Sequence, residues 1–285
     1  MNSSAHGLYV VGLLLMAVMV SGCKDPSEVS EAQAKLHVVE LARNVRSDVA
    51  EVRNGLPAGA ECMAAFFNRE SLGPEQGNDA REALSKCRNK VQDLRIAKST
   101  FFVAASSDGL VIRNDRDQDL MAGKNLFSAY PELRQALTGK YVETQGSMPE
   151  AAGAKGRADA QWVAAQPVRV AGEVRGLYAT GWSWAAYAYR LEFALRSSVL
   201  SSLRDRQKAP LVYVFVVVGQ SAYGTPISPL INAQEVERQN PLAGATETVP
   251  FARRIEITGR PFGLAVIRTP SLGKDAGIAV LRSET

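Results

Sequence analysis

Histidine is nearly absent from this chain of 285 residues, which contains only His6 and His37. A Ser-His-Asp hydrolase needs a histidine beside its nucleophile, and a histidine-rich metal site needs several. A glycine-rich phosphate loop followed by Lys-Ser or Lys-Thr is also missing. We interpret His37 as a solvated residue on a polar helix. The sequence therefore predicts no enzyme, and it indicates no catalytic residue, metal site or cofactor.

Three alternating aspartates are the nearest approach to a metal motif. Asp115, Asp117 and Asp119 resemble the start of an EF-hand calcium loop. Counting from Asp115, the sixth position is Leu120, where an EF-hand has glycine. The twelfth position is Leu126, where an EF-hand has a bidentate glutamate. We therefore expect a solvated, turn-forming acidic loop.

No basic stripe stands out, although the formal net charge is +4 and the isoelectric point is near 9.0. The 33 Lys and Arg residues are interleaved with 29 Asp and Glu residues along the chain. A nucleic-acid footprint requires basic residues clustered on one face. The sequence therefore predicts no nucleic-acid partner.

Long apolar runs are limited to one, Leu8–Val20, which is too short to span a bilayer core that needs about 20 residues. Ser21, Gly22 and Cys23 follow it, and the segment resembles a bacterial lipoprotein signal peptide. One feature departs from that pattern, because no Lys or Arg precedes Tyr9. The resemblance implies that residues 1–22 are removed, that Cys23 carries lipid and that residues 23–30 are a tether. We expect a lipid-anchored protein of the cell envelope, on the periplasmic or outer-surface side of a bacterial membrane.

Two cysteines remain after Cys23, and an exported protein permits a disulfide between them. Cys62 shares helical spacing with Phe66, and Cys87 lies on the apolar stripe of another predicted helix. The turn at 72–78 lets the two helices fold back on each other. We predict a Cys62–Cys87 bridge; two buried free thiols are the alternative.

The section 31–99 is predicted to be entirely helical. Apolar residues recur every three or four positions from Val38 to Leu56, which is typical of an amphipathic helix. The sequence Asn54–Pro57 predicts a break or kink. Two further helices are expected over residues 58–71 and 79–98.

Strand patterns begin near residue 100 and occur in two similar series. The first series, 100–184, has strands predicted at 100–105, 110–114, 141–145, 161–170 and 173–182, a short helix at 131–137 and a mobile loop at 146–159. The second series, 185–285, begins with the connecting helix, predicted at 183–206. It continues with a helix at 232–239 and strands at 211–218, 246–258, 261–269 and 276–283. The fold class is therefore α+β, with an N-terminal helical stalk followed by two PAS-like antiparallel-sheet modules.

The segment Phe101–Tyr141 resembles the extracellular Cache sensor domains of bacterial receptors. The resemblance lies in an apolar strand, an Asp108-Gly109 turn, the strand Val111–Asn114 and the motifs Gly123-Lys124-Asn125-Leu126, Tyr130-Pro131-Glu132-Leu133, Ala136-Leu137 and Gly139-Lys140. Cache domains carry a long N-terminal helix and one or two PAS-like sheets that bind small ligands. Such receptors normally continue into a transmembrane helix and a cytoplasmic domain, whereas this chain ends at Thr285. The resemblance therefore implies signalling through a membrane-protein partner.

A pocket in a PAS-like sheet forms between its concave face and its short helix. By that geometry the candidate ligand-binding residues are Arg113, Tyr130, Arg134, Trp162, Gln166 and Tyr178. An arginine among them would pair with a carboxylate ligand. The aromatic cluster Trp182, Trp184, Tyr187 and Tyr189 is interpreted first as packing between the modules.

Two functions from different classes follow from these patterns. The first is a lipid-anchored extracytoplasmic sensor, or small-ligand-binding protein, that signals through a membrane partner. The second is a structural or assembly lipoprotein that uses the same fold as a protein-binding surface. A pocket plugged by Trp and Tyr side chains favours the second, and an open cavity with an unpaired arginine favours the first.

Overall fold

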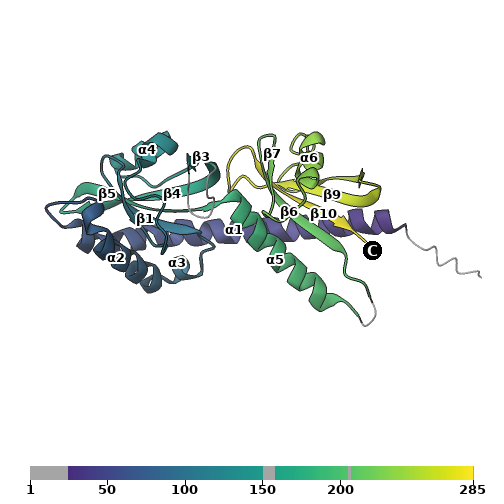
Figure 1. Ribbon diagram of the computed structural model, residues 1–285, viewed down its shortest axis with the longest axis horizontal. Helices are drawn as coiled ribbons and strands as arrows, with labels where there is room; N and C mark the ends of the chain where they lie inside the picture. The colour runs from purple at the N-terminus through teal and green to yellow at the C-terminus, as the bar shows by residue number, and fades with distance from the viewer. Residues whose placement is uncertain (1–24, 150–157, 205–206, 285) are drawn as a thin grey trace, which may run out of the picture.

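One long helix extends along the whole body of the protein (Figure 1). The computed structural model describes residues 25–149, 158–204 and 207–284, so the apolar leader and Cys23 lie outside the described residues. The helix α1 (Pro26–Phe67) has 42 residues and is about 63 Å long at 1.5 Å per residue. Its buried face runs from Ser30 to Phe67 and contacts strands of both sheets. The predicted stalk is therefore packed against both modules.

The predicted break at Asn54–Pro57 is wrong, because α1 continues through Pro57 to Phe67. Proline removes one helical hydrogen bond. However, Leu56 and Ala60 on either side are buried, so packing holds this part of the helix in place. The separate helix expected at 58–71 is therefore the end of α1. The helix expected at 79–98 is divided into α2 (Gly77–Lys90) and α3 (Gln92–Ile96), and a short helix, η1 (Pro74–Gln76), precedes them.

The first module is a five-stranded antiparallel sheet in the order β2-β1-β5-β4-β3. Its strands are β1 (Phe101–Ser106), β2 (Val111–Asn114), β3 (Val142–Pro149), β4 (Ala158–Val170) and β5 (Glu173–Ser183). The predicted hairpin is present, with Gly109 at a φ of 87° in its turn. The mobile loop expected at 146–159 is wrong at both ends, which belong to β3 and β4, and residues 150–157 lie outside the described residues.

The second module repeats this strand order as β7-β6-β10-β9-β8. It follows the connecting helix α5 (Trp184–Ser202) and contains β6 (Leu211–Val218), β7 (Ser221–Tyr223), α6 (Leu230–Arg238), β8 (Phe251–Ile257), β9 (Arg260–Arg268) and β10 (Ala276–Ser283). The predicted α+β class with two antiparallel PAS-like sheets is therefore confirmed. Within the part of the chain that the structure describes, no helix combines the length and the apolar character needed to cross a bilayer.

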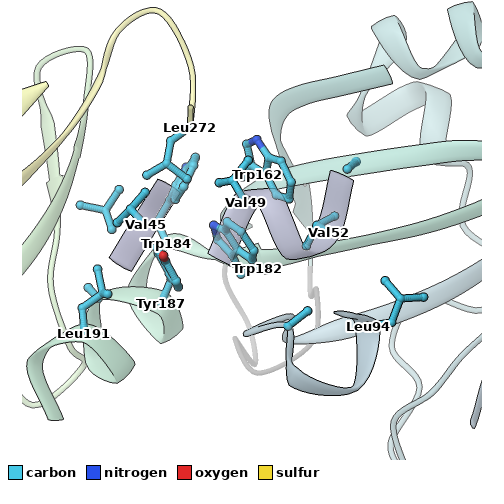
Figure 2. Packing of buried hydrophobic residues seen from close by; sticks show 14 of the residues in the cluster. Val45, Val49, Val52, Leu94, Trp162, Trp182, Trp184, Tyr187, Leu191 and Leu272 are labelled. Carbon is cyan, nitrogen blue, oxygen red and sulfur yellow. The ribbon is translucent and has the colours of Figure 1, made fainter. Parts of the chain in front are cut away.

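The largest hydrophobic cluster lies between α1 and both sheets, so one core joins the two modules. Figure 2 shows its centre, where Val45, Val49 and Val52 of α1 meet aromatic side chains from β4, β5 and α5. Trp182 stacks on Trp162 at 4.4 Å and on Tyr187 at 4.6 Å between ring centroids. The packing interpretation therefore holds for Trp182, Trp184 and Tyr187, which are buried, but not for Tyr189, which is exposed.

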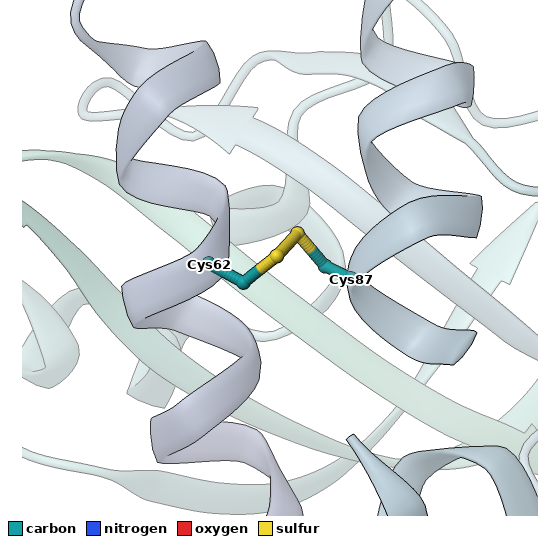
Figure 3. Close-up of a disulfide and its surroundings, with 2 residues drawn as sticks. All are labelled: Cys62 and Cys87. Atoms are coloured by element: carbon teal, nitrogen blue, oxygen red, sulfur yellow. A yellow bond between two sulfur atoms is a disulfide. The ribbon is translucent and has the colours of Figure 1, made fainter. Parts of the chain in front are cut away.

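The disulfide joins α1 to α2 (Figure 3). Cys62 and Cys87 are bonded, with their Cα atoms 5.6 Å apart, as the sequence predicted. Cys87 is buried in the core, and Cys62 packs against it. The bridge therefore fixes α2 against the end of α1 beside the first sheet.

Removal of this bridge should lower the free energy of unfolding by about 3.5 kcal/mol, because it closes a loop of 25 residues. The measurement is urea denaturation of the Cys62→Ala/Cys87→Ala variant beside the parent protein, each with and without reductant. Reductant should weaken the parent and leave the variant unchanged. Equal stability of the parent and the variant would contradict the expected contribution.

A buried hydrogen bond connects α1 to α5 near the junction of the modules. The Tyr187 hydroxyl donates to Asp48 Oδ2 at 2.7 Å, and both residues are buried. Burial raises the pKa of the Asp48 carboxyl and also raises the pKa of the Tyr187 hydroxyl. Since the folded-state pKa of Asp48 exceeds its unfolded value, its contribution favours folding at acid pH and is lost as pH rises through the folded pKa.

We expect Tyr187→Phe to lower the free energy of unfolding by about 1.5–3 kcal/mol at pH 7, because a buried carboxylate loses its donor. The loss should shrink at acid pH, where Asp48 is protonated. Urea denaturation at several pH values measures both effects. Tyr189→Phe, on the exposed face of the same helix, is the matched control and should change little. A loss independent of pH would contradict the role given to the Asp48 charge.

Candidate functional site

The face of the first sheet opposite α1 is where the sequence placed a ligand pocket. The helices α4 (Leu126–Ala129) and η2 (Pro131–Thr138) cover it. Buried side chains of the chain itself pack there in one cluster, which includes Phe101, Val103, Met121, Phe127, Tyr130, Leu133, Met148, Val163 and Leu177. Tyr130 is fully buried and donates to Gln161 Oε1 at 2.5 Å, and burial raises the pKa of its hydroxyl. In this module, therefore, a tyrosine fills the space beneath the short helices.

Three of the predicted ligand residues face α1 instead. Trp162 and Tyr178 belong to the core cluster under α1, and Gln166 lies directly across from Tyr178 in the strand register. Side chains alternate between the two faces of a strand, so these even-numbered positions of β4 and β5 share one face. Their neighbours Val163 and Leu177 lie on the other. Trp162, Gln166 and Tyr178 therefore lie on the α1 side of the sheet, and their contact with a ligand stays a prediction.

The two predicted arginines are already engaged. Arg113 is on the edge strand β2, where it donates to the backbone carbonyls of Arg116 and Asp117 and lies 3.5 Å from the Asp119 carboxylate. Arg134 is exposed on η2 with its guanidinium over the Phe127 ring. The Arg113 Nε, however, is buried without a hydrogen-bond partner among the described residues, so ligand contact by this arginine stays a prediction. Ligand contact by Arg134 or Tyr130 stays a prediction.

The acidic loop uses its carboxylates to hold backbone and arginine partners. Asp119 accepts from the amides of Asn114, Met121 and Ala122, and Asp115 accepts from the amide of Phe102. Over the described ranges, no group of three or more His, Cys, Asp or Glu side chains is placed to hold a metal ion. The loop thus has the turn-forming role expected of it, but the expected solvation holds only for Asp117, because the Asp115 and Asp119 side chains are 8% and 1% exposed.

His37 differs from its predicted solvated state. Arg282 Nη1 lies 2.7 Å from His37 Nε2 and donates to it. Burial, reinforced by the positive charge of Arg282, lowers the pKa of His37 to about 4. His37 is therefore a neutral acceptor that ties α1 to the last strand at physiological pH.

An open cavity of about 470 Å³ lies between the two modules. Its lining residues are Ser147, Asp159, Ala160, Ala185, Phe215, Ala222, Tyr223, Gly224, Thr225, Pro226, Ser228, Pro229, Leu230 and Ala233. They come from β3 and β4 of the first module, from the start of α5, and from β6 to α6 of the second. Small-molecule sites commonly have this size, with mostly apolar walls and a few polar groups. We call this space the inter-module cavity.

Polar groups on both sides of the inter-module cavity are positioned by the surrounding elements. Asp159 is held by Ser183 Oγ, which donates to Oδ1 at 2.7 Å, and by Gln161 Nε2, which donates to Oδ2 at 3.1 Å. Across the cavity, the Ser228 hydroxyl oxygen is buried with no hydrogen-bond partner among the described residues.

The sequence analysis missed these residues. Residues 219–229 are rich in Gly, Ser and Pro, which indicates turns but no binding site. The cavity forms because residues near 147, 159 and 185 lie opposite residues 222–233 in the folded chain. Such a meeting of segments far apart in the chain leaves no local pattern.

The comparisons with known proteins concern the fold. No family model and no curated protein sequence matches the chain. Among solved structures, a domain of a sensory box/GGDEF family protein from Vibrio parahaemolyticus matches with a TM-score of 0.55 and 8% identity, over 92% of this chain and 98% of that one. An extracellular ligand binding receptor from Desulfohalobium retbaense matches with a TM-score of 0.51 and 13% identity, over 89% of this chain.

The chain spans only 40% of the length of that Desulfohalobium receptor. A third structure, methyl-accepting chemotaxis protein X, has a TM-score of 0.50 and 16% identity, over 90% of this chain and 97% of that one. At these identities the likeness concerns the fold. The chain therefore shares the fold of these three structures, in which a long N-terminal helix packs against two PAS-like antiparallel sheets.

Proposed function

We propose that this protein is a lipid-anchored extracytoplasmic sensor that binds a small molecule in the inter-module cavity and signals through a membrane protein. The observation that carries the proposal is the cavity itself, because it is open, has a volume of about 470 Å³ and is lined by residues of both modules. The similar Desulfohalobium protein is described as an extracellular ligand binding receptor, which is consistent with this role.

The position of the cavity gives a route from binding to signalling. A ligand there touches β4 and the start of α5 on one side, and β7 and α6 on the other. Its binding free energy therefore depends on the arrangement of the two modules. A ligand shifts an equilibrium between two conformations only if it binds one of them more tightly. A site shared by two modules provides such a difference, because its shape changes when the modules change their arrangement.

The lining residues favour neutral or cationic ligands over carboxylates. Among the described lining residues there are four hydroxyl groups, from Ser147, Tyr223, Thr225 and Ser228, and one carboxylate, Asp159. No Lys, Arg or His belongs to this described lining. The arginine-to-carboxylate recognition expected from the sequence is therefore replaced by hydroxyl hydrogen bonds and a negative wall.

One observation favours the alternative function, a structural or assembly lipoprotein. The space under η2, where the sequence expected a ligand, is occupied by Tyr130 and its apolar neighbours. A module whose core is filled in this way still offers its outer surface to another protein. The two functions differ in whether the inter-module cavity binds small molecules.

We expect amines and neutral polar compounds to raise the melting temperature of the purified protein by about 5–10 °C at a hundred times the dissociation constant. The measurement is a thermal-shift screen that also includes amino acids and organic acids. Ala233→Trp places an indole in the cavity and should abolish the shift, because Ala233 lines it.

The matched control for this screen is Gln234→Trp, at the next, exposed position of α6, which should retain the shift. The Ala233→Trp protein must still unfold cooperatively for the comparison to count. Absence of a shift with every class of compound would contradict the sensor role and favour the structural lipoprotein.

The lipid anchor has its own test. Intact-mass and peptide mass spectrometry should find a mature chain that begins at Cys23 and carries diacylglycerol on its thiol. Cys23→Ser should leave the chain unprocessed and without lipid, whereas Ser21→Ala, a small-to-small change, should leave processing intact. An unmodified Cys23 on an unprocessed chain would contradict the anchor and the assigned compartment.

A further inference from the structure

The connecting helix α5 carries large apolar side chains on the face turned away from the protein. Tyr189, Phe193 and Leu200 are 48%, 63% and 57% exposed, whereas Leu191, Leu195 and Val199 on the opposite face are buried. At about 100° per residue, the three exposed residues lie within about 40° of one another around the helix. They form one narrow line along the helix, which we call the α5 stripe.

The geometry of the α5 stripe fits another helix. Tyr189, Phe193 and Leu200 are separated by four and seven residues, which matches the spacing of a coiled-coil seam. The seam position between Phe193 and Leu200 is Arg196, whose guanidinium turns back to Glu192 and the Val212 carbonyl. Small residues flank the stripe at Ser197 and Ser201, so a second helix can approach closely. A helix that lies in a membrane surface has a wider apolar face, of about 100° or more. The narrow stripe therefore favours a helix over a bilayer.

The charged residues of α5 indicate which kind of helix can bind to the α5 stripe. The charged residues of α5 are Arg190, Arg196 and Glu192. Arg196 pairs with the buried Glu192 carboxylate at 3.0 Å, and Arg190 donates to the backbone carbonyls of Lys98 and Ser99. With the exposed Arg204 that follows the helix, α5 and its C-terminal end carry three arginines and one glutamate, a net charge of +2, so two copies would repel each other. The complementary occupant is an amphipathic helix with an apolar seam and flanking Asp or Glu residues.

The same helix is connected to the inter-module cavity. Its N-cap residue Ser183 donates to Asp159 in the cavity wall, and Ala185 in its first turn lines the cavity. Tyr187, one turn further, is bonded to Asp48 of α1. A ligand that moves the start of α5 would therefore move the α5 stripe as well.

We propose that the α5 stripe is the surface through which this protein contacts its signalling partner, and that the partner contributes an acidic amphipathic helix. This inference deepens the proposed function and rests on it for the identity of the partner as a signalling protein. The surface itself is defined by Tyr189, Phe193 and Leu200.

The test uses two synthetic helical peptides of about three heptads with leucine at the seam positions. One has glutamate at the flanking positions and the other has lysine at the same positions. Fluorescence anisotropy measures the binding of each labelled peptide to the purified protein. The acidic peptide should bind at least tenfold more tightly than the basic one, and salt should weaken its binding.

Phe193→Ser and Leu200→Ser should each weaken binding of the acidic peptide by about tenfold. Val249→Ser removes an apolar side chain that is 62% exposed outside α5, and it is the matched control that should leave binding unchanged. Because all three side chains are exposed, the melting temperatures of the variants should stay close to that of the parent.

Other occupants are outcomes that would overturn the inference. One is equal binding of the acidic and basic peptides, or binding of the acidic peptide that neither Phe193→Ser nor Leu200→Ser weakens. Another is self-association in sedimentation equilibrium that Phe193→Ser abolishes, which would assign the stripe to a second copy. A third is binding to phosphatidylglycerol vesicles that the same variant abolishes. If small molecules still raise the melting temperature but the acidic peptide does not bind, only the role of the α5 stripe is overturned. If the peptide binds but no small molecule raises the melting temperature, only the sensor role is overturned.

Discussion

The burial of one face of α1 under both sheets is the interaction on which the rest of the structure depends. Val38, Val45 and Val52 are fully buried at intervals of seven residues, and the buried face continues to Phe67. Helices in proteins gain most of their stability from packing of an apolar face rather than from intrinsic propensity. Because the same helix packs against two sheets, each module helps to keep α1 folded, and the other module needs the folded α1 to cover its own sheet.

This shared core also fixes the junction of the modules. The stacked rings of Trp162, Trp182 and Tyr187 lie between the first sheet and α5, and the Tyr187 hydroxyl reaches Asp48 on α1. A buried carboxylate is costly unless it is hydrogen-bonded, so this contact specifies one position of α5 relative to α1. The start of α5 is thereby held at the edge of the inter-module cavity, where Ser183 and Ala185 contribute to the site.

Much of the fold was predictable because its signals are local. The strand Leu211–Val218 and the strand Ala276–Ser283 have the bounds that their apolar runs indicated. The Cys62–Cys87 bridge followed from two apolar helix faces and a turn between them. The break at Pro57 was wrongly predicted because proline acts locally, whereas the packing that overrides it comes from residues far along the chain.

The candidate site was harder to predict for a related reason. Strands β1 and β5 are buried on both faces, so their sequences give no sign of which residues face α1 and which face η2. Tyr178 and Leu177 are equally apolar in pattern yet lie on opposite sides of the sheet. Only the position of α1, set by the whole core, distinguishes the two faces.

The same double burial explains where an open cavity remains. Each sheet needs a cover on both faces, and in the first module Tyr130, Phe127 and their neighbours supply the outer cover completely. The second sheet has its own outer cluster, which includes Phe215 and Val236. The inter-module cavity lies between these two outer clusters, beside Ala185 and Ala233. A small molecule bound there can stabilise both modules at once without displacing either core, which is the physical basis for coupling its binding to the position of α5.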